Sequence, residues 1–276
     1  MITIDNQKCI GCGKCAKDCI ALAIQIMDGT AVPTKDCLLC GHCVAICPTN
    51  AVSIPDYDMN DIIEYDPDTF SLSPETLLNS IKFRRSIRDY KAQPIEDEKR
   101  DLILQAGRYT ATAKNNQDCH FIFVQDELET LKKYIWDYID SVEVNGARQI
   151  PKEFLPFVNF NRRRKKNPND DYLFRNAPAV LFITSDWPLD AGLAAQNMEL
   201  MAVASGLGTL YNGYLARIAN ENEALKDWLC ISGKTIKACM LLGYPNVRYE
   251  RTAPRKKANI ISVSYTHLTL PTTSRV

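Results

Sequence analysis

The sequence predicts an α+β protein in which a small cysteine-rich domain precedes a larger domain of mixed helices and strands. Two observations support this division. Eight of the eleven cysteines fall between residues 9 and 47, whereas the apolar residues of the second part alternate between helical spacing and short continuous runs. With 276 residues, 46% of them hydrophobic and 24% charged, the chain has a globular composition and is long enough for two domains.

The charge balance gives no support to a nucleic-acid or membrane-surface role, because Lys+Arg and Asp+Glu number 33 each. The basic run "RRRKK" at 162–166 is followed by "NPNDD", which predicts a solvated loop. The first residues lack the basic and apolar regions of a secretory signal, and the longest apolar runs are too short to span a bilayer. We therefore expect a cytoplasmic protein without nucleic-acid or membrane partners.

The first domain contains an internal repeat. Residues 8–26 ("KCIGCGKCAKDCIALAIQI") align with residues 36–54 ("DCLLCGHCVAICPTNAVSI"), and each copy reads C-x2-C-x2-C-x3-C. The short spacers allow three thiolates of one loop to hold three corners of a cubane, and the fourth corner comes from elsewhere in the chain. Structural zinc is the alternative, but zinc sites usually separate their cysteine pairs by about a dozen residues or more. The spacing favours iron–sulfur clusters.

This repeat resembles the bacterial two-cluster ferredoxin, in which the fourth cysteine of each run ligates the other cluster. The resemblance implies one [4Fe–4S] cluster on Cys9, Cys12, Cys15 and Cys47, and a second on Cys37, Cys40, Cys43 and Cys19. One departure is Ile20, which stands where the proline after the fourth cysteine is expected, whereas the second run keeps Pro48. We expect this ferredoxin-like 2×[4Fe–4S] domain to cover residues 1–60, with the clusters holding it folded.

A linker is expected at residues 61–74. From Asp61 to Glu75 the chain carries five acidic residues, no Lys or Arg, and two prolines, which is typical of an extended connection. After it, Ser73 and Pro74 stand where the N-cap and first residue of a helix at 73–83 are expected.

Helix and strand signals then follow one another through the larger domain. Further helices are predicted at 94–107, 126–140 and 190–206, the last apolar on most sides and therefore central. Strands are predicted at 119–125 and 177–185. Two more strand segments, at 207–213 and 234–244, surround a helix at 220–230.

The stretch "RRSIRDY" at 84–90 is chemically informative, because three arginines and a serine within five residues offer forked, permanently charged donors and a hydroxyl. Such a set suits a phosphate monoester, although a similar run is more often surface charge. Its context adds to the signal. The stretches "ATAKNNQ" (111–117), "NAPAVLFI" (176–183), "AAQNMELMAVASGLGTLYNG" (194–213) and "LLGYP" (241–245) follow it in order.

Together these stretches resemble the nitroreductase family of FMN enzymes over residues 75–262. The resemblance implies a homodimer with FMN held between the subunits. It also implies contacts to four parts of the flavin. The residues are Arg84, Arg85, Ser86 and Arg88 at the phosphate and ribityl chain, Asn115 and Gln117 at the isoalloxazine, Asn212 and Gly213 near the N5 edge, and Arg255 and Lys257 again at the phosphate. The stretch "QDCH" at 117–120 departs from the Gln-Pro-Trp of many relatives, which leaves the wall of the substrate pocket open.

Other candidate residues give weaker signals. Cys119, Cys230 and Cys239 have apolar neighbours and are expected in the core. Residues 148–175 have no clear period and carry aromatic residues, so they form either a lid over the active site or a surface excursion. The sequence singles out no catalytic acid, and no dinucleotide-binding fingerprint is present.

The C-terminal residues 263–276 are expected to be non-native, because "VSYTHLTLPTT" is similar to a sequencing adapter translated as protein.

The combined features predict an iron–sulfur flavoprotein oxidoreductase that passes electrons from two [4Fe–4S] clusters to FMN and on to a small organic acceptor, such as a nitro compound or a quinone. The electron donor would be an external ferredoxin or NAD(P)H. Two alternatives stay open. One is an NAD(P)H-dependent FMN nitroreductase with accessory clusters, and the other is a non-catalytic electron-transfer or redox-sensing module with a degenerate flavin site.

Overall fold

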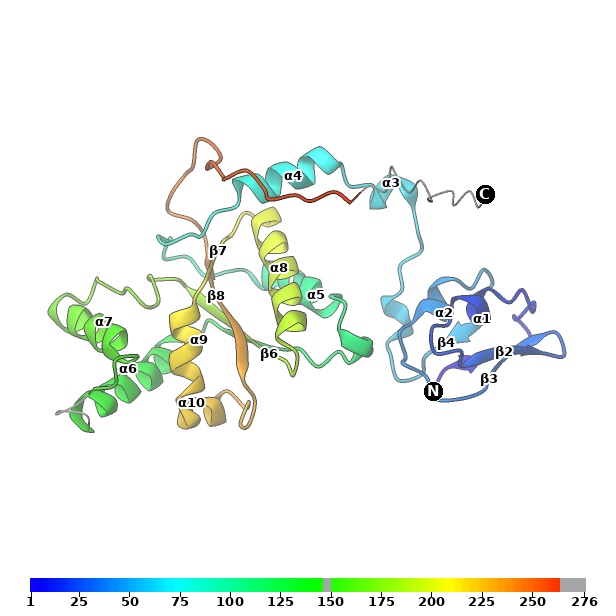
Figure 1. The fold of residues 1–276 in the computed structure, drawn as a ribbon, viewed down its shortest axis with the longest axis horizontal. Coiled ribbons are helices and arrows are strands. Elements are labelled where there is room, and N and C mark those ends of the chain that lie inside the picture. The colour runs from blue at the N-terminus through cyan, green and yellow to red at the C-terminus, as the bar shows by residue number, and fades with distance from the viewer. Residues whose placement is uncertain (146–149, 264–276) are drawn as a thin grey trace, which may run out of the picture.

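The computed structural model describes residues 1–145 and 150–263. Its first part, residues 1–60, is called the cysteine module below. Two antiparallel strand pairs, β1 with β4 and β2 with β3, enclose the short helices α1 and α2 (Figure 1). The bounds are β1 Thr3–Ile4, α1 Lys14–Asp18, β2 Ile24–Met27, β3 Thr30–Pro33, α2 His42–Ala45 and β4 Val52–Ser53.

The internal repeat of the sequence is also a structural repeat. Helices α1 and α2 each start directly after a glycine in the left-handed region, Gly13 at φ 71° and Gly41 at φ 77°. Gly11 is more tightly constrained: at φ +63°, a Cβ on this residue would lie 2.1 Å from the carbonyl oxygen of Gly29. The backbone of the first cysteine loop therefore passes against the β2–β3 turn at a distance that only glycine allows.

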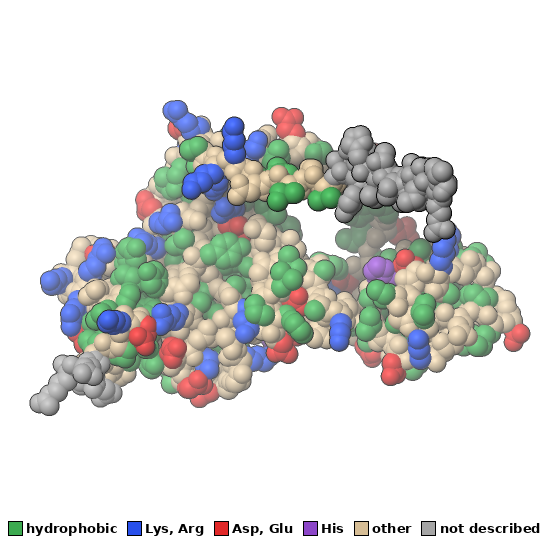
Figure 2. Space-filling model, in the orientation of Figure 1, with side chains coloured by type: hydrophobic (Ala, Val, Ile, Leu, Met, Phe, Trp, Pro, Cys, Tyr) green, Lys and Arg blue, Asp and Glu red, His purple; other side chains and the backbone are tan. Residues whose placement is uncertain are grey.

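Residues 59–83 connect the two parts through short helical elements. The 3₁₀ turn η1 (Met59–Asp61) and helix α3 (Pro67–Phe70) are capped by Asp58 and Asp66, and α4 follows at Pro74–Phe83. The predicted cap of α4 is confirmed, because the Ser73 hydroxyl accepts a hydrogen bond from the backbone N–H of Thr76 at 3.4 Å. No residue of α4 is buried. In Figures 1 and 2 this helix stands outside the body of the larger domain.

The larger domain, called the flavin domain below after the cofactor that the sequence resemblance implies, is built on a four-stranded antiparallel sheet of order β5-β6-β8-β7. The strands are β5 His120–Val124, β6 Ala179–Thr184, β7 Gly208–Tyr211 and β8 Ile236–Gly243. Every residue of the central strand β6 is buried, as expected for a strand covered by helices on both faces.

Alternate residues of β6 and β8 contact two separate cores. Leu181 and Met240 face the core formed with α5 and α8, whereas Phe182 and Leu241 face the core formed with α6, α7, α9 and α10. The two helical layers follow from this alternation (Figure 1). The helix bounds are α5 Asp97–Arg108, α6 Leu128–Asn145, α7 Leu155–Lys166, α8 Pro188–Ala204, α9 Gly213–Asn220 and α10 Glu223–Trp228.

Three expectations about this domain were wrong or incomplete. The run at 162–166 is the C-terminal part of α7 and not a loop. Residues 148–175 do not form a simple lid, because Phe157 and Val158 of α7 are buried in the core. Of the three cysteines expected inside, only Cys239 is buried, whereas Cys119 is half-buried and Cys230 is exposed.

No helix within the described residues combines the length and apolar character required to cross a membrane. The expectation of a non-native tail concerns residues of which all but Val263 lie outside the described part of the chain.

Candidate functional site

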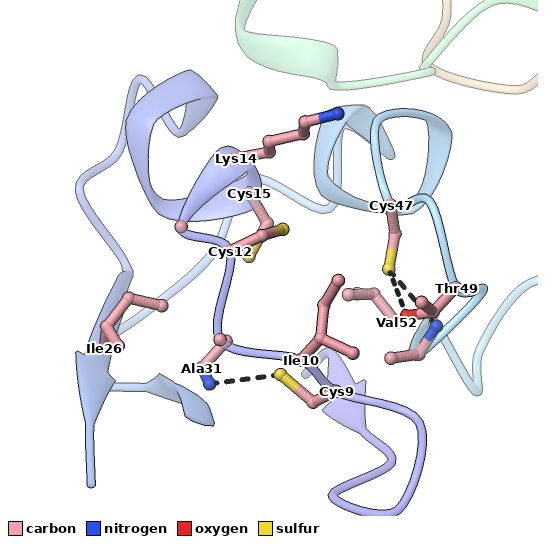
Figure 3. A pocket seen from close by; sticks show the side chains of 13 residues that line it. Cys9, Ile10, Cys12, Lys14, Cys15, Ile26, Ala31, Cys47, Thr49 and Val52 are labelled. Carbon is pink, nitrogen blue, oxygen red and sulfur yellow. Dashed lines mark hydrogen bonds between the residues drawn. The ribbon is translucent and has the colours of Figure 1, made fainter. Parts of the chain in front are cut away.

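Four cysteines line one cavity of the cysteine module. Cys9, Cys12 and Cys15 come from the first loop and the start of α1, and Cys47 comes from the turn after α2 (Figure 3). Cys15 and Cys47 thus lie together although they belong to different repeats. This is the set of four that the ferredoxin resemblance assigns to one cluster.

The remaining four cysteines of the repeat lie around α2. Cys43 is buried in this helix, and burial together with the nearby thiols of Cys37 and Cys40 raises its pKa to about 11. Cys19 ends α1, which packs against α2. The structure therefore brings Cys43 close to Cys37 and Cys40 and places Cys19 on the neighbouring helix end.

Backbone N–H groups donate to four of the eight sulfurs. The donors are Ala31 to Cys9 (3.4 Å), Ala23 to Cys19 (3.3 Å), Leu39 to Cys37 (3.3 Å) and Ala51 to Cys47 (3.2 Å). For Cys47, burial opposes ionisation, but the hydrogen bonds from Ala51 and Thr49 lower the thiol pKa below its ordinary value. Such bonds stabilise thiolate charge and tune the reduction potential of a cluster.

Zinc and a cubane place different demands on the cysteine thiols. Zinc holds four thiolates at about 2.3 Å, which brings the sulfurs within about 4 Å of one another. Within the described residues, no group of three His, Cys, Asp or Glu side chains is arranged to hold a single metal ion. A [4Fe–4S] cluster instead takes one thiolate on each of its four irons, which the four cysteines of the shared cavity can supply.

The arginine segment of the flavin domain runs along the sheet edge. Ser86 forms a parallel bridge with Thr209, and the N–H of Ile87 donates to the Thr209 carbonyl at 2.9 Å. Arg84 and Arg85 line one cavity with Gly208 and Tyr249. Arg88 lines a different one, so the structure does not gather the three arginines in a single cradle.

Arg84 and Arg85 differ in their availability to a ligand. Nη1 of Arg84 donates to Oε1 of Glu199 at 3.1 Å, and Glu199 is only 1% exposed. Nη2 of Arg85 is buried without a hydrogen-bond partner among the described residues. An unpaired buried guanidinium N–H is costly, so this atom fits an anionic ligand such as a phosphate.

The cavity of Arg88 also contains two more of the expected flavin contacts, Asn212 and Gly213. Asn212 is the N-cap of α9: its Oδ1 accepts from the N–H of Leu215 at 2.9 Å, and its Nδ2 donates to the Leu173 carbonyl at 2.6 Å. Gly213 is therefore held as the first residue of this helix. The same cavity is lined by residues that sequence reasoning missed, namely Tyr172, Arg175, Tyr211, Tyr214 and Arg217.

Aromatic packing connects this cavity to α7. The ring of Phe160 stacks on Tyr172 at 4.6 Å between centroids, and Phe157 meets Tyr214 edge-on at 5.9 Å. Arg175 lies over the Tyr172 ring, 3.7 Å from its centroid. The segment expected to be either a lid or a surface excursion thus forms a packed wall behind the cavity.

The other expected flavin contacts lie outside both cavities. Asn115 and Gln117 are near the cysteine module, and their side chains donate hydrogen bonds to Leu38, Leu39 and Tyr57 of that module. Arg255 and Lys257 are exposed on the C-terminal segment. Within one chain, the ten residues implied by the resemblance therefore fall into separate groups.

Glu199 is another residue that the sequence analysis missed. It lies in the middle of the buried helix α8 and accepts hydrogen bonds from Arg84, Thr209 and Gln196. The only signal was a glutamate within an otherwise apolar run, and a buried carboxylate of this kind requires partners.

Comparison with known proteins explains these arrangements. Residues 81–244, more than half of the chain, match the model of the nitroreductase family. The chain belongs to this family. Residues 8–52 match the 4Fe-4S dicluster domain. These matches confirm the predicted combination of folds, the two [4Fe–4S] clusters of the first domain and the class of enzyme, a nitroreductase-type oxidoreductase.

The relatives are distant but cover the flavin domain. An NADPH-flavin oxidoreductase of Vibrio harveyi is 28% identical over 189 residues, which span 67% of this chain and 71% of that protein. The solved structure of a nitroreductase with bound FMN from Bacteroides fragilis has a TM-score of 0.54 and 20% identity, covering 67% of this chain and 98% of the other. An FMN-dependent nitroreductase from Clostridium difficile has a TM-score of 0.51 and 22% identity, covering 70% and 100%. At these identities the solved structures show a shared fold.

Proposed function

We propose that this nitroreductase-family protein binds FMN and passes electrons from its two [4Fe–4S] clusters through the flavin to a small organic acceptor. The observation that carries the proposal is the presence, in one chain, of a four-thiol cavity and a nitroreductase fold with an arginine- and tyrosine-lined cavity. FMN supplies the chemistry that converts single electrons into a two-electron reduction. Fusion supports this route, because a tethered donor has a high effective concentration at its acceptor.

The residues of the chain fit such a flavin. Arg85 offers an unpaired buried N–H for the phosphate, and Arg88 stands in the cavity with Asn212 and Gly213. Tyr172, Tyr211 and Tyr214 supply aromatic and hydroxyl surfaces on the same wall. We assign these residues to holding and orienting the flavin and the acceptor.

Two features support a homodimer as the functional unit. Asn115 and Gln117 lie apart from the cavity of Arg88, so one chain does not gather all the expected flavin contacts. In addition, α4 exposes an apolar row, with Leu77 at 38%, Leu78 at 49% and Ile81 at 47% exposure. A second copy that covers this helix and completes the flavin site would account for both.

The dimer is tested with Leu78→Glu and Ile81→Glu together, using Lys82→Glu as a control at the same helix. The double variant should elute as a monomer and lose FMN, whereas the wild type should elute as a dimer. A monomeric variant that keeps stoichiometric FMN would contradict the interface site.

The reaction is tested after anaerobic purification by counting iron, sulfide and FMN per chain. About eight iron and eight sulfide ions and one FMN are expected. After a pulse of photoreductant, absorbance should show the clusters reduced first and the flavin second. Zinc in place of iron, or reduced clusters that never reduce FMN, would refute the proposal.

Direct reduction by NAD(P)H is the second candidate, favoured by the named activity of the Vibrio harveyi relative. Stopped-flow mixing with NADH or NADPH distinguishes it. Bleaching of the flavin while the clusters stay oxidised would assign the clusters an accessory role. A cluster-loaded protein that never retains FMN would instead indicate an electron carrier.

A further inference from the structure

The contact between the cysteine module and the flavin domain is centred on one side chain. Nδ2 of Asn115 donates two hydrogen bonds, to the carbonyl of Leu38 at 3.0 Å and to that of Leu39 at 3.1 Å. Both carbonyls belong to the loop between Cys37 and Cys40, which the ferredoxin resemblance assigns to the second cluster. Both hydrogens of the amide are thereby used in holding the loop.

From this loop a hydrogen bond continues to a sulfur. The N–H of Leu39 donates to Sγ of Cys37 at 3.3 Å, and Leu39 itself is in the left-handed region at φ 51°. The peptide of Leu39 therefore lies between a cluster ligand and Asn115. Among the described residues, no hydrogen bond joins the first loop, Cys9–Cys15, to the flavin domain. The two cysteine loops therefore differ in their hydrogen bonding to the flavin domain, and it is the Cys37–Cys43 loop that Asn115 contacts.

The segment that carries Asn115 has a strained backbone. Lys114, Asn115 and Gln117 all have positive φ, at 53°, 56° and 51°. The buried carboxylate of Asp190, at the start of α8, holds the segment by accepting from the N–H of Ala113 at 2.9 Å. Left-handed non-glycine residues cost free energy and tend to persist where function requires them.

Two further contacts fix the orientation of the module. Nε2 of Gln117 donates to the hydroxyl of Tyr57 at 2.8 Å. Asp61, the residue that directly follows the module, accepts from the hydroxyl of Tyr109 at 2.5 Å and pairs with Arg108 at 2.6 Å. Three separated contacts determine a single orientation, whereas a flexible tether alone would allow many.

We propose that the Cys37–Cys43 loop is the exit through which electrons leave the cysteine module, and that Asn115 is the positioning residue that holds this loop against the flavin domain. This inference rests on the proposed function. It gives the module a direction: the Cys9, Cys12, Cys15 and Cys47 site takes up electrons from the external donor, and the Cys19, Cys37, Cys40 and Cys43 site delivers them. Each transfer oxidises the delivering cluster by one electron, and two electrons with two protons from solvent reduce one FMN.

The direct test releases the docking contacts without touching cluster ligands or expected flavin contacts. In the full-length, cofactor-loaded protein, Tyr57→Phe and Asp61→Ala are combined, with Asp56→Ala as the control, since Asp56 is an exposed carboxylate of the cysteine module that pairs with the N-terminus. Deuterium exchange at residues 37–43 measures docking, and transient absorbance after a photoreductant flash measures electron transfer from the clusters to FMN.

The double variant should expose the loop to exchange and slow electron transfer by about tenfold, because only a fraction of modules is then correctly docked. Iron, sulfide and FMN contents should be unchanged, and the control should behave as wild type. Loop exposure at an unchanged transfer rate overturns the inference. Unchanged exchange in the double variant also overturns it, because the contacts would then not hold the loop.

A second variant tests the direction. Asn115→Leu removes both hydrogen bonds to the Leu38 and Leu39 carbonyls, so it should shift the reduction potential of one cluster and leave the other at its wild-type value. Equal shifts of both clusters, or no shift, would contradict an exit at the second loop. If the wild-type protein never reduces FMN, the proposed function itself fails. If the wild type reduces FMN and the variants are unaffected, only this inference fails.

Discussion

The cysteine module and the flavin domain bury very different cores. The module's buried cluster is small and includes two of the cysteines that the ferredoxin resemblance implies as cluster ligands, Cys15 and Cys43. The flavin domain instead packs two layers of helices against both faces of a fully buried central strand, β6. Apolar burial can therefore stabilise the second region by itself, whereas the first depends on what its thiols bind.

The largest expected effect follows directly from this contrast. Cys43→Ser, or removal of iron by a chelator, should unfold residues 1–60 and leave the flavin domain folded. Hydrogen exchange along the chain, read together with the thermal transition of the flavin domain, measures this. The matched control is Cys239→Ser, a cysteine buried in the flavin domain, which should cost about 1–3 kcal/mol of that domain only. Simultaneous loss of protection in both regions on iron removal would show that they share one core.

A second variant tests whether the flavin domain also depends on a polar centre. Glu199→Ala should lower the free energy of unfolding by about 2 kcal/mol, because it leaves Arg84, 24% exposed, without its partner. Glu199→Gln should cost less, since it keeps the hydrogen bond from Thr209. Urea denaturation of the flavin domain measures both. An unchanged urea midpoint for Glu199→Ala would mean that the Arg84–Glu199 pair makes no net contribution to the free energy of unfolding.

Two glycines of the flavin domain test how tightly the core of that domain is packed. A Cβ on Gly107 would lie 2.8 Å from Sδ of Met198 and 2.9 Å from the Phe121 ring, whereas one on Gly192 would meet no atom within 4 Å. Gly107→Ala should therefore destabilise the domain by about 1–2 kcal/mol. Gly192→Ala should stabilise it by up to about 1 kcal/mol, because alanine favours a helix. Equal effects on the melting temperature would indicate a core loose enough to absorb a methyl group.

The smallest expected effect concerns pH and the contact between the two regions. The hydrogen bond from Tyr109, and then Arg108, lowers the pKa of Asp61, and the same hydrogen bond raises the pKa of Tyr109. A carboxylate with a lowered pKa loses its contribution only as the pH falls through that value. The protection factor of the amides of residues 37–43, which is the exchange rate corrected for its intrinsic pH dependence, should thus stay constant between the ordinary aspartate pKa of about 4 and the ordinary tyrosine pKa of about 10. Undocking near neutral pH would assign the contact to another group.

The sequence allowed the local parts of this molecule to be predicted. The cysteine repeat, the cap of α4 and the strands of the sheet depend on short-range spacing and on apolar period, which a single sequence displays. Helices α7 and α9 were not predicted. In α7 the basic run at 162–166 dominates the sequence pattern and obscures the side of the helix that buries Phe157. Helix α9 begins at Asn212 and Gly213, which were predicted as the end of a strand.

The contacts that join distant segments could not be predicted in the same way. Asn115 meets Leu38 across 77 positions, and Arg84 meets Glu199 across 115. Neither partner carries a local signature of the other, so only the folded chain shows that an expected flavin contact also holds the cysteine module.

The shared cavity of Cys9, Cys12, Cys15 and Cys47 has a consequence for biosynthesis. As the nascent chain leaves the ribosome, the first repeat emerges with three of the ligands that the ferredoxin resemblance implies for one site and one of those for the other, so it completes neither set. Under this assignment the second site is complete once Cys43 has been translated, and the first once Cys47 has followed four residues later, so neither can be loaded before most of the second repeat has emerged. Any fragment cut between the repeats would hold no full ligand set, which makes the pair of repeats the smallest unit that maturation factors can load.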